Sequence, residues 1–263
     1  MLVSFRPGGL TAWGNAYLTG ATSLDDAVDE IVGTDALHRV TGVPGETDVV
    51  SLAVALGRLR ATGIEALRLA LPEPGDPTGL PGPAHVTTSA LVAGAAVLTV
   101  GPRDLASYAL LPSSATSGAS DVVRWDVVEV DHSTAPYGLP TLSEADRALA
   151  EAMRSTTHEL DVLDVARGRD DVGPRLVALD RSLRRIELPA SLPGRAQRMV
   201  ATSSRLLGIL TLATQDDGAA VTATEAHRRR EALRPLRTAA RYALCAGYSA
   251  AAEQSTDAGP RPR

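Results

Sequence analysis

The chain has 263 residues, of which 44% are hydrophobic, 22% charged and 3% aromatic, and its formal net charge is −5 at pH 7. This composition excludes an intrinsically disordered chain and a collagen, and a single cysteine excludes a disulfide framework. The longest apolar run, residues 90–100, is about half as long as a membrane span. Arg6 and Pro7 are not followed by the apolar core of a signal peptide. We therefore expect a cytoplasmic protein that does not contact a membrane.

The charged residues are of one basic type and are unevenly distributed. All 26 basic residues are arginine, which excludes a lysine Schiff base, a P-loop lysine and a lysine general base. Residues 1–140 hold 7 Arg against 15 acids, a net charge of −8, whereas residues 141–263 hold 19 Arg against 16 acids, a net charge of +3. This asymmetry indicates two structural units.

The first half of the chain alternates strand-like and helix-like segments. Ser23 precedes a run with a helical apolar period, and Gly33 follows it, a pattern typical of a capped helix. The loop at 72–83 holds five Pro and three Gly, which excludes a helix or a central strand there. The expected helices are 24–32, 47–62 and 87–93, and the expected strands are 12–18, 66–71, 95–100, 105–111 and 122–130, the later ones forming an antiparallel meander.

The second half is expected to be helical throughout. Thr141 and Glu144 match a capping box ahead of a helix that extends to about residue 165. Pro174 and Pro193 stand where two further helices would begin. Pro235 interrupts the last helical stretch and is expected to kink it or split it in two.

These elements predict an α+β fold in two domains. Residues 1–140 are expected to form a small mixed or antiparallel sheet with helices, and residues 141–253 an antiparallel helical bundle. Residues 254–263 are polar and rich in Pro and Gly, which is typical of a disordered tail.

No group of side chains has the spacing of a metal or cofactor site, and we expect neither. Glu151, His158 and Asp161 share one face of a predicted helix, but the neighbouring helices offer no matching ligands. A solvated helix face is therefore the preferred interpretation. Cys245 lies in an alanine-rich helix and is interpreted as a buried thiol without catalytic function.

Two loops carry the candidate catalytic residues. Glu73 and Asp76 lie in the proline-rich loop at the end of a predicted strand, and His132 and Tyr137 lie in the segment that joins the two halves. Loops on a rigid sheet are common places for ligand-contacting side chains. A carboxylate from the first loop and His132 from the second would form an acid–base pair if they met. The alternative is a stiff connection and an ordinary linker.

One segment of the last helix has the composition of a nucleic-acid footprint. Glutamates within and beside this segment, the acidic balance of the whole chain and the lack of interleaved aromatic residues speak against that function. Its arginines form a possible interaction surface: Arg228, Arg229, Arg230, Arg234 and Arg237.

Three hypotheses for the function remain open. The sequence favours a non-catalytic protein that acts through protein–protein contacts as an oligomer, with a homodimer formed through alanine-rich helices such as 239–252. An enzyme or small-molecule binder would use the cleft between the two halves, with the four loop residues as its site. A nucleic-acid binder would use the arginine-rich helix.

Overall fold

The computed structural model describes residues 5–102, 104–117, 120–131, 139–162, 172–215 and 223–257. The chain divides into two compact units. The sheet unit comprises Val3–Leu139, Glu187–Pro193 and the residues from Tyr248 onward. The helical unit comprises Pro140–Ile186 and Gly194–Gly247, together with the first two residues. The described residues form a mixed α+β structure of eight helices and a six-stranded sheet.

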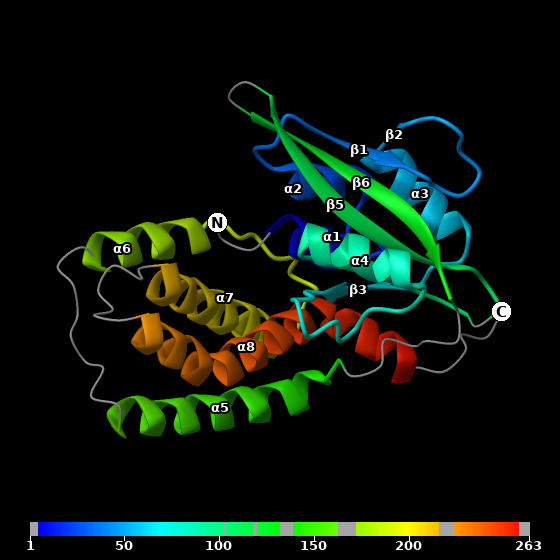
Figure 1. The fold of residues 1–263 in the computed structure, drawn as a ribbon. Coiled ribbons are helices and arrows are strands. Elements are labelled where there is room, and N and C mark those ends of the chain that lie inside the picture. Colours follow the sequence, from blue (N-terminus) through cyan, green and yellow to red (C-terminus); the bar gives the residue numbers. More distant parts are fainter. Residues whose placement is uncertain are drawn as a thin grey trace. The chain divides into compact units, whose positions relative to one another are not determined.

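The strands of the sheet unit form one sheet in the order β2-β1-β6-β5-β4-β3 (Figure 1). From β3 to β6 each strand pairs antiparallel with the next, which confirms the expected meander. The first strand instead pairs parallel with β6, so the sheet is mixed. The strands are β1 Leu37–Thr41, β2 Val50–Ser51, β3 Ala66–Ala70, β4 Ala96–Val100, β5 Ser107–Ser117 and β6 Ser120–Val130.

The predicted strand at 12–18 is wrong, because those residues belong to helix α1, Phe5–Leu18. This helix is buried on nearly all sides, so its sequence lacks the one-sided apolar period by which a surface helix is recognised. Its glycines are sites of close packing. A Cβ atom on Gly14 would lie 2.5 Å from Cδ1 of Leu67 on β3, and one on Gly8 would lie 2.5 Å from Cζ of Tyr248.

The bounds of the next two helices differ in how well they were predicted from the sequence. Helix α2, Leu24–Val32, begins and ends as expected, because the Ser23 side chain accepts a hydrogen bond from the main-chain N–H of Asp26. Helix α3, Leu52–Ala61, begins five residues later than the expected Thr47. Ser51 is its N-cap and also the last residue of β2, so strand pairing with β1 delays the helix.

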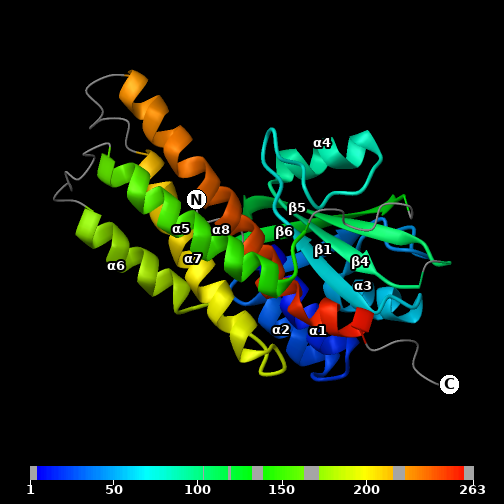
Figure 2. The ribbon, with the colours of Figure 1, turned by 90° about the horizontal axis from the view of Figure 1, so that it is seen from below.

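The sheet carries helices on both faces. Helices α1 and α2 lie on one side and α4, Ala84–Ala93, on the other (Figure 2). The α4 side holds a compact core in which Val86 and Ala90 of the helix pack with Leu98, Leu111 and neighbouring strand residues. Trp125 of β6 faces the α1 side and is fully buried.

The helical unit contains α5 Leu142–Val162, α6 Val172–Leu183, α7 Gly194–Gln215 and most of α8 Ala223–Asp257. The capping box that opens α5 is confirmed: the Thr141 N–H donates to Oε2 of Glu144 at 2.9 Å, and the Glu144 N–H donates to Oγ1 of Thr141 at 3.3 Å. Pro174 lies in the first turn of α6, and Pro193 directly precedes α7.

Small residues let these helices approach closely. A Cβ on Gly208 of α7 would lie 2.5 Å from Leu179 of α6, and one on Gly247 of α8 would lie 2.9 Å from Val200 of α7. Of the kink or split expected at Pro235, the split is wrong, because α8 continues through Pro235 and past Gln254 to Asp257. The kink stays a prediction. Pro235 is exposed, so water can reach the carbonyl group that proline leaves without its helical hydrogen bond.

Candidate functional site

The proline-rich loop fixes Glu73 and Asp76 in a tight turn. The main-chain N–H of Glu73 donates to the carbonyl of Asp76 at 3.1 Å, and the N–H of Asp76 donates back to the carbonyl of Glu73 at 2.8 Å. The Asp76 carboxylate also accepts hydrogen bonds from the N–H of Thr78 at 3.3 Å and from its hydroxyl at 2.6 Å. One role of Asp76 is therefore to hold the loop in its own shape.

The two candidate loops contact each other where they are described. The N–H of Asp131 donates to the carbonyl of Gly82 at 3.3 Å, and a Cβ on Gly79 would lie 2.8 Å from Cγ of Leu139. His132 and Tyr137 lie outside the described residues. The structure thus brings the two loops together at their ends, and the acid–base pair between them stays a prediction.

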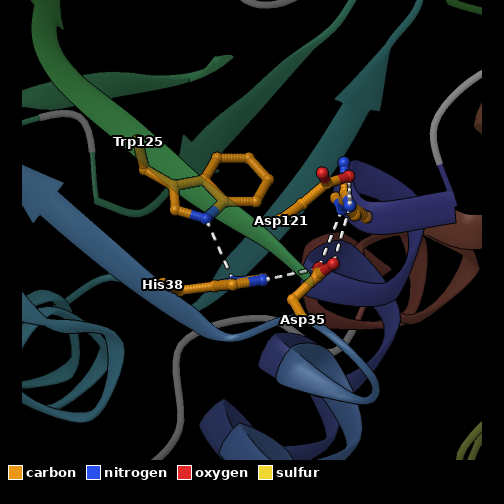
Figure 3. A network of polar contacts seen from close by, with 5 residues as sticks. Asp35, His38, Asp121 and Trp125 are labelled. Carbon is orange, nitrogen blue, oxygen red and sulfur yellow. Dashed lines mark hydrogen bonds and ion pairs between the residues drawn. The ribbon is translucent and has the colours of Figure 1, made fainter. Parts of the chain in front are cut away.

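A partly buried polar network in the sheet unit was not predicted from the sequence (Figure 3). Arg6 of α1 makes a two-pronged contact with the Asp35 carboxylate, through Nε at 2.8 Å and Nη2 at 2.6 Å. The same Nη2 contacts Asp121 at 2.6 Å. Nε2 of His38 lies 3.1 Å from Asp35, and Nδ1 of His38 accepts a hydrogen bond from the Trp125 indole at 3.3 Å.

This network resembles a catalytic Asp–His pair, but both nitrogens of the His38 ring are buried and occupied by contacts within the protein. The His38 side chain is 0% exposed, and burial lowers its pKa despite the opposing effect of Asp35. Burial would raise the pKa of Asp35, yet the hydrogen bonds from Arg6 and His38 lower it overall. A neutral imidazole that donates to Asp35 and accepts from Trp125 has no nitrogen left to act on a substrate.

The signal for this network in the sequence is faint. Asp35 and His38 are three residues apart at the start of a strand, but Arg6 and Asp121 lie far from them along the chain. The network joins α1 to β1 and β6, so only the parallel pairing of these two strands brings its members together. Spacing along the chain could not reveal that pairing.

Among the residues that the structure describes, α4 covers only part of its face of the sheet. On β6, Val128 and Val130 pack in the core beneath α4, and residues at even positions nearer the start of the strand share their face. The exposed side chains there include Arg124 and Asp126. Strand register extends this surface, which we call the open sheet face; its residues are Leu37, Arg39 and Thr41 of β1, Val122, Arg124 and Asp126 of β6, and Ser113 of β5.

The open sheet face carries two arginines side by side. Arg39 is the register partner of Arg124, which in turn is the partner of Ser113. All three are exposed. Asp126, one step along the same face, accepts a hydrogen bond from the Thr41 hydroxyl at 2.6 Å. This pair was not predicted from the sequence, because the two residues are 85 positions apart and only the strand register brings them together.

Most arginines of the α8 segment are exposed where their side chains are described. Arg228, Arg230 and Arg234 are exposed, Arg237 is half-buried, and the Arg229 side chain lies outside the described residues. Arg234 forms an ion pair with Glu231 of the same helix at 3.4 Å.

On α5, the Glu151 side chain pairs with Arg154, and both are largely exposed. The His158 side chain lies outside the described part. Within the described ranges, no group of three or more His, Cys, Asp or Glu residues could hold a metal ion. No helix described here has the length and apolar character needed to cross a bilayer.

Comparisons with known proteins identify one family. The family models of the N-terminal and C-terminal domains of Rv1486c-like proteins match residues 8–138 and 143–245. The chain is 27% identical over 277 aligned positions to the uncharacterized protein Rv1486c of Mycobacterium tuberculosis H37Rv, covering 92% of this chain and 95% of that protein. It is 26% identical over 246 positions to the uncharacterized protein ML1804 of Mycobacterium leprae, covering 78% and 83%. No solved structure matches the chain.

Proposed function

Because the chain belongs to the Rv1486c-like family, whose two domain models match it in succession, we propose that it is a non-catalytic protein that acts through protein–protein contacts. We propose further that its partner docks on the open sheet face. The relatives named above are uncharacterized, so the proposal is argued from this chain's own residues.

The observation that carries the proposal is the partly covered sheet. Helix α4 packs on β3, β4 and the adjoining ends of β5 and β6. On the same face, the part of the sheet near β1 exposes Arg39, Arg124 and Asp126. Leu37 and Val122 lie beside them and are half-buried, so the surface mixes charged and apolar groups. Interfaces between proteins also combine apolar and polar groups.

We also propose the finer organisation expected from the sequence. A domain over residues 1–140 would be followed by an antiparallel helical bundle over 141–253, and the separate matches of two domain models support that division. Self-association in the cytoplasm remains part of the proposal. We do not place the interface for self-association in the alanine-rich segment 239–252. Gly247 of that segment packs against Val200 within the chain, and most of the segment is buried.

A steric block on the open sheet face tests the function. Ser113→Tyr adds a large side chain at an exposed position and leaves both arginines in place. Ser89→Tyr adds the same side chain at an exposed position of α4 and serves as the control. Each variant is expressed in the organism from which the chain comes and purified gently at near-physiological salt. Native mass spectrometry then measures the masses of its complexes.

We expect the wild-type chain and Ser89→Tyr to carry a protein partner or a second copy, and Ser113→Tyr to lose it. Equal complexes in all three would overturn the docking surface. A chain that carries only a metabolite or a nucleotide would overturn the interaction function itself.

A second candidate function, an enzyme or small-molecule binder, is supported by the contact between the two loops at Gly82 and Asp131. Its residues would be Glu73, Asp76, His132 and Tyr137, as the sequence analysis proposed. A small-molecule adduct that disappears from Glu73→Gln and persists in Ser113→Tyr would favour this candidate over docking.

A further inference from the structure

The open sheet face contains two guanidinium groups that form no ion pair with any carboxylate in the described part of the chain. Arg39 and Arg124 are register partners on neighbouring parallel strands, which lie about 4.8 Å apart. Neither side chain makes an ion pair or hydrogen bond with another residue that the structure describes. By contrast, Arg6, Arg58 and Arg205 each contact a carboxylate.

This arrangement is unfavourable in the isolated chain. Like charges directly opposite each other on adjacent strands destabilise a sheet. The carboxylate at Asp126, one step along the same face, already accepts the Thr41 hydroxyl. An external group that brought two negative charges to this row would relieve the repulsion between Arg39 and Arg124.

From this geometry we propose that the partner presents an amphipathic acidic helix, which lies on the open sheet face and places two carboxylates on Arg39 and Arg124. The inference rests on the proposed docking function and names the chemistry of the partner. Acidic residues at positions i and i+4 of a helix have Cβ atoms about 5–6 Å apart, close to the spacing of the two strands. Guanidinium groups bind carboxylates with paired hydrogen bonds.

The rest of the face fits a helix of this kind. Leu37 and Val122 occupy the adjacent row and are half-buried, so they offer apolar contact next to the charged row. Ser113, on the other side of Arg124, adds a hydroxyl group. On the same side of the sheet, α4 already packs its Val86 and Ala90 on the neighbouring strands, so a partner helix would complete a layer that this chain begins.

A nucleic acid fits the face less well. A protein that binds a phosphate backbone usually neutralises several phosphates, whereas this row offers two arginines with Asp126 on the same surface. The surrounding apolar residues would find no counterpart on a phosphate chain. Nucleic acid therefore enters the experiment as the competing outcome.

The test measures peptide binding to the full chain by two-dimensional NMR and calorimetry. The probe is a short helical peptide of Glu, Ala and Leu with glutamates spaced i and i+4. A peptide with Lys in place of each Glu and a short DNA duplex are compared with it. The variants are the double substitution R39Q and R124Q, and R198Q as a control that removes one exposed arginine of α7.

We expect the acidic peptide to bind the wild-type chain and R198Q alike, to shift the signals of β1 and β6, and to bind the double variant at least about tenfold more weakly. Binding should also weaken as salt is added. Equal binding to the double variant, equal binding of the Lys peptide, or tighter binding of DNA would each overturn the proposal. If the double variant still carries the complex that Ser113→Tyr loses, the docking function stands and only the acidic chemistry fails.

Discussion

Asn15, the one asparagine of the chain, hydrogen-bonds through both polar atoms of its side chain to the main chain of Leu67. Its Nδ2 donates to the Leu67 carbonyl at 2.9 Å, and the Leu67 N–H donates to its Oδ1 at 2.7 Å. Leu67 lies on β3, an edge of the sheet, so the side-chain amide takes the place of a missing neighbouring strand. Two residues along, the Leu69 N–H donates to the hydroxyl of Ser249 at 2.9 Å. Side chains from α1 and α8 thus close this edge against pairing with another chain.

Replacing Asn15 should destabilise the protein strongly. Asn15→Ala would leave a buried donor and a buried acceptor of Leu67 without partners, and we expect a loss of about 2–4 kcal/mol in the free energy of unfolding. Ser249→Ala removes one hydrogen bond from the same edge and should cost about 1–2 kcal/mol. Urea unfolding of both variants measures the difference. A loss in Asn15→Ala no larger than that in Ser249→Ala would show that the paired contact does not stabilise the edge as argued.

The sequence predicted elements well where their signals are local. Ser23 and Gly33 bracket α2, and Thr141 and Glu144 open α5, because caps bond to groups within one turn of the chain. The sequence predicts a strand within helix α1 because the helix is packed on nearly all sides and lacks a one-sided apolar period. Its Gly14 lets the helix approach Leu67. That contact depends on the distant strand β3, as does the Asn15 hydrogen bond, whose partner is 52 residues away.

The candidate sites divide in the same way. Local composition pointed to the proline-rich loop and to the arginines of α8. The structure places them in a loop and in a helix, and their role as sites stays a prediction. The open sheet face and the network of His38 with Asp35 depend on the parallel pairing of β1 with β6. Strand order between distant segments has no signature in one sequence. The parallel pairing of β1 with β6 is therefore visible only in the structure. The same holds for the residues that this pairing brings together.

Removing the hydroxyl of Tyr248 should leave the protein as stable as before or slightly more so. Tyr248 is 2% exposed, its hydroxyl has no hydrogen-bond partner among the described residues, and burial raises its pKa. Tyr248→Phe removes an unpaired buried polar group and keeps the ring, so we expect a gain of about 0–2 kcal/mol. Thermal and urea unfolding measure it. A marked loss of stability would mean that the hydroxyl has a partner, such as a bound water molecule.

The ring of Tyr248 also makes Gly8 intolerant of any side chain. A Cβ on Gly8 would lie 2.5 Å from Cζ and 2.6 Å from Cε2 of the ring, which is closer than nonbonded atoms approach. Gly8→Ala should therefore cost about 2–3 kcal/mol through overpacking, although alanine normally favours a helix. Gly9→Ala is the matched control on α1, because a Cβ there meets no atom within 4 Å. Equal stability of the two variants in urea would refute the close packing.

Two glycines of the β1–β2 connection allow the cost of backbone strain to be measured apart from the cost of a steric clash. Gly42 and Gly45 both have positive φ, 70° and 80°. A Cβ on Gly42 would lie 2.3 Å from the main-chain oxygen of Val127, whereas one on Gly45 meets nothing within 4 Å. Gly45→Ala should cost about 1 kcal/mol from strain alone, and Gly42→Ala about 3 kcal/mol or more, because the main chain of β6 cannot move aside easily. The comparison fails if urea unfolding gives the two variants the same free energy.

The buried imidazole of His38 should make the stability of the protein depend on pH. Burial lowers its pKa from the ordinary value of 6.5, so the folded protein keeps the imidazole neutral at a pH where the unfolded chain binds a proton. The unfolded state therefore binds more protons below about pH 6.5, and the free energy of unfolding falls as the pH drops from there toward the lowered pKa. The slope contributed by one group is at most about 1.4 kcal/mol per pH unit. Above pH 6.5 this contribution is constant.

The measurement is urea unfolding between pH 7.5 and about pH 5.5. This range lies above the ordinary value of 3.8 for Asp35, whose pKa is lowered further by Arg6 and His38 and whose stabilising charge is lost only at more acid pH. His38→Gln removes the titrating group and should flatten the slope below pH 6.5, even though the loss of the contacts with Asp35 and Trp125 lowers stability at every pH. His85→Gln replaces an exposed histidine of α4 and is the matched control for the substitution itself. The absolute stability of His38→Gln is reduced in any case, so the slope of stability against pH is the decisive quantity. If the His38→Gln curve ran parallel to that of the wild type, the imidazole of the folded protein would already be charged or would reach water.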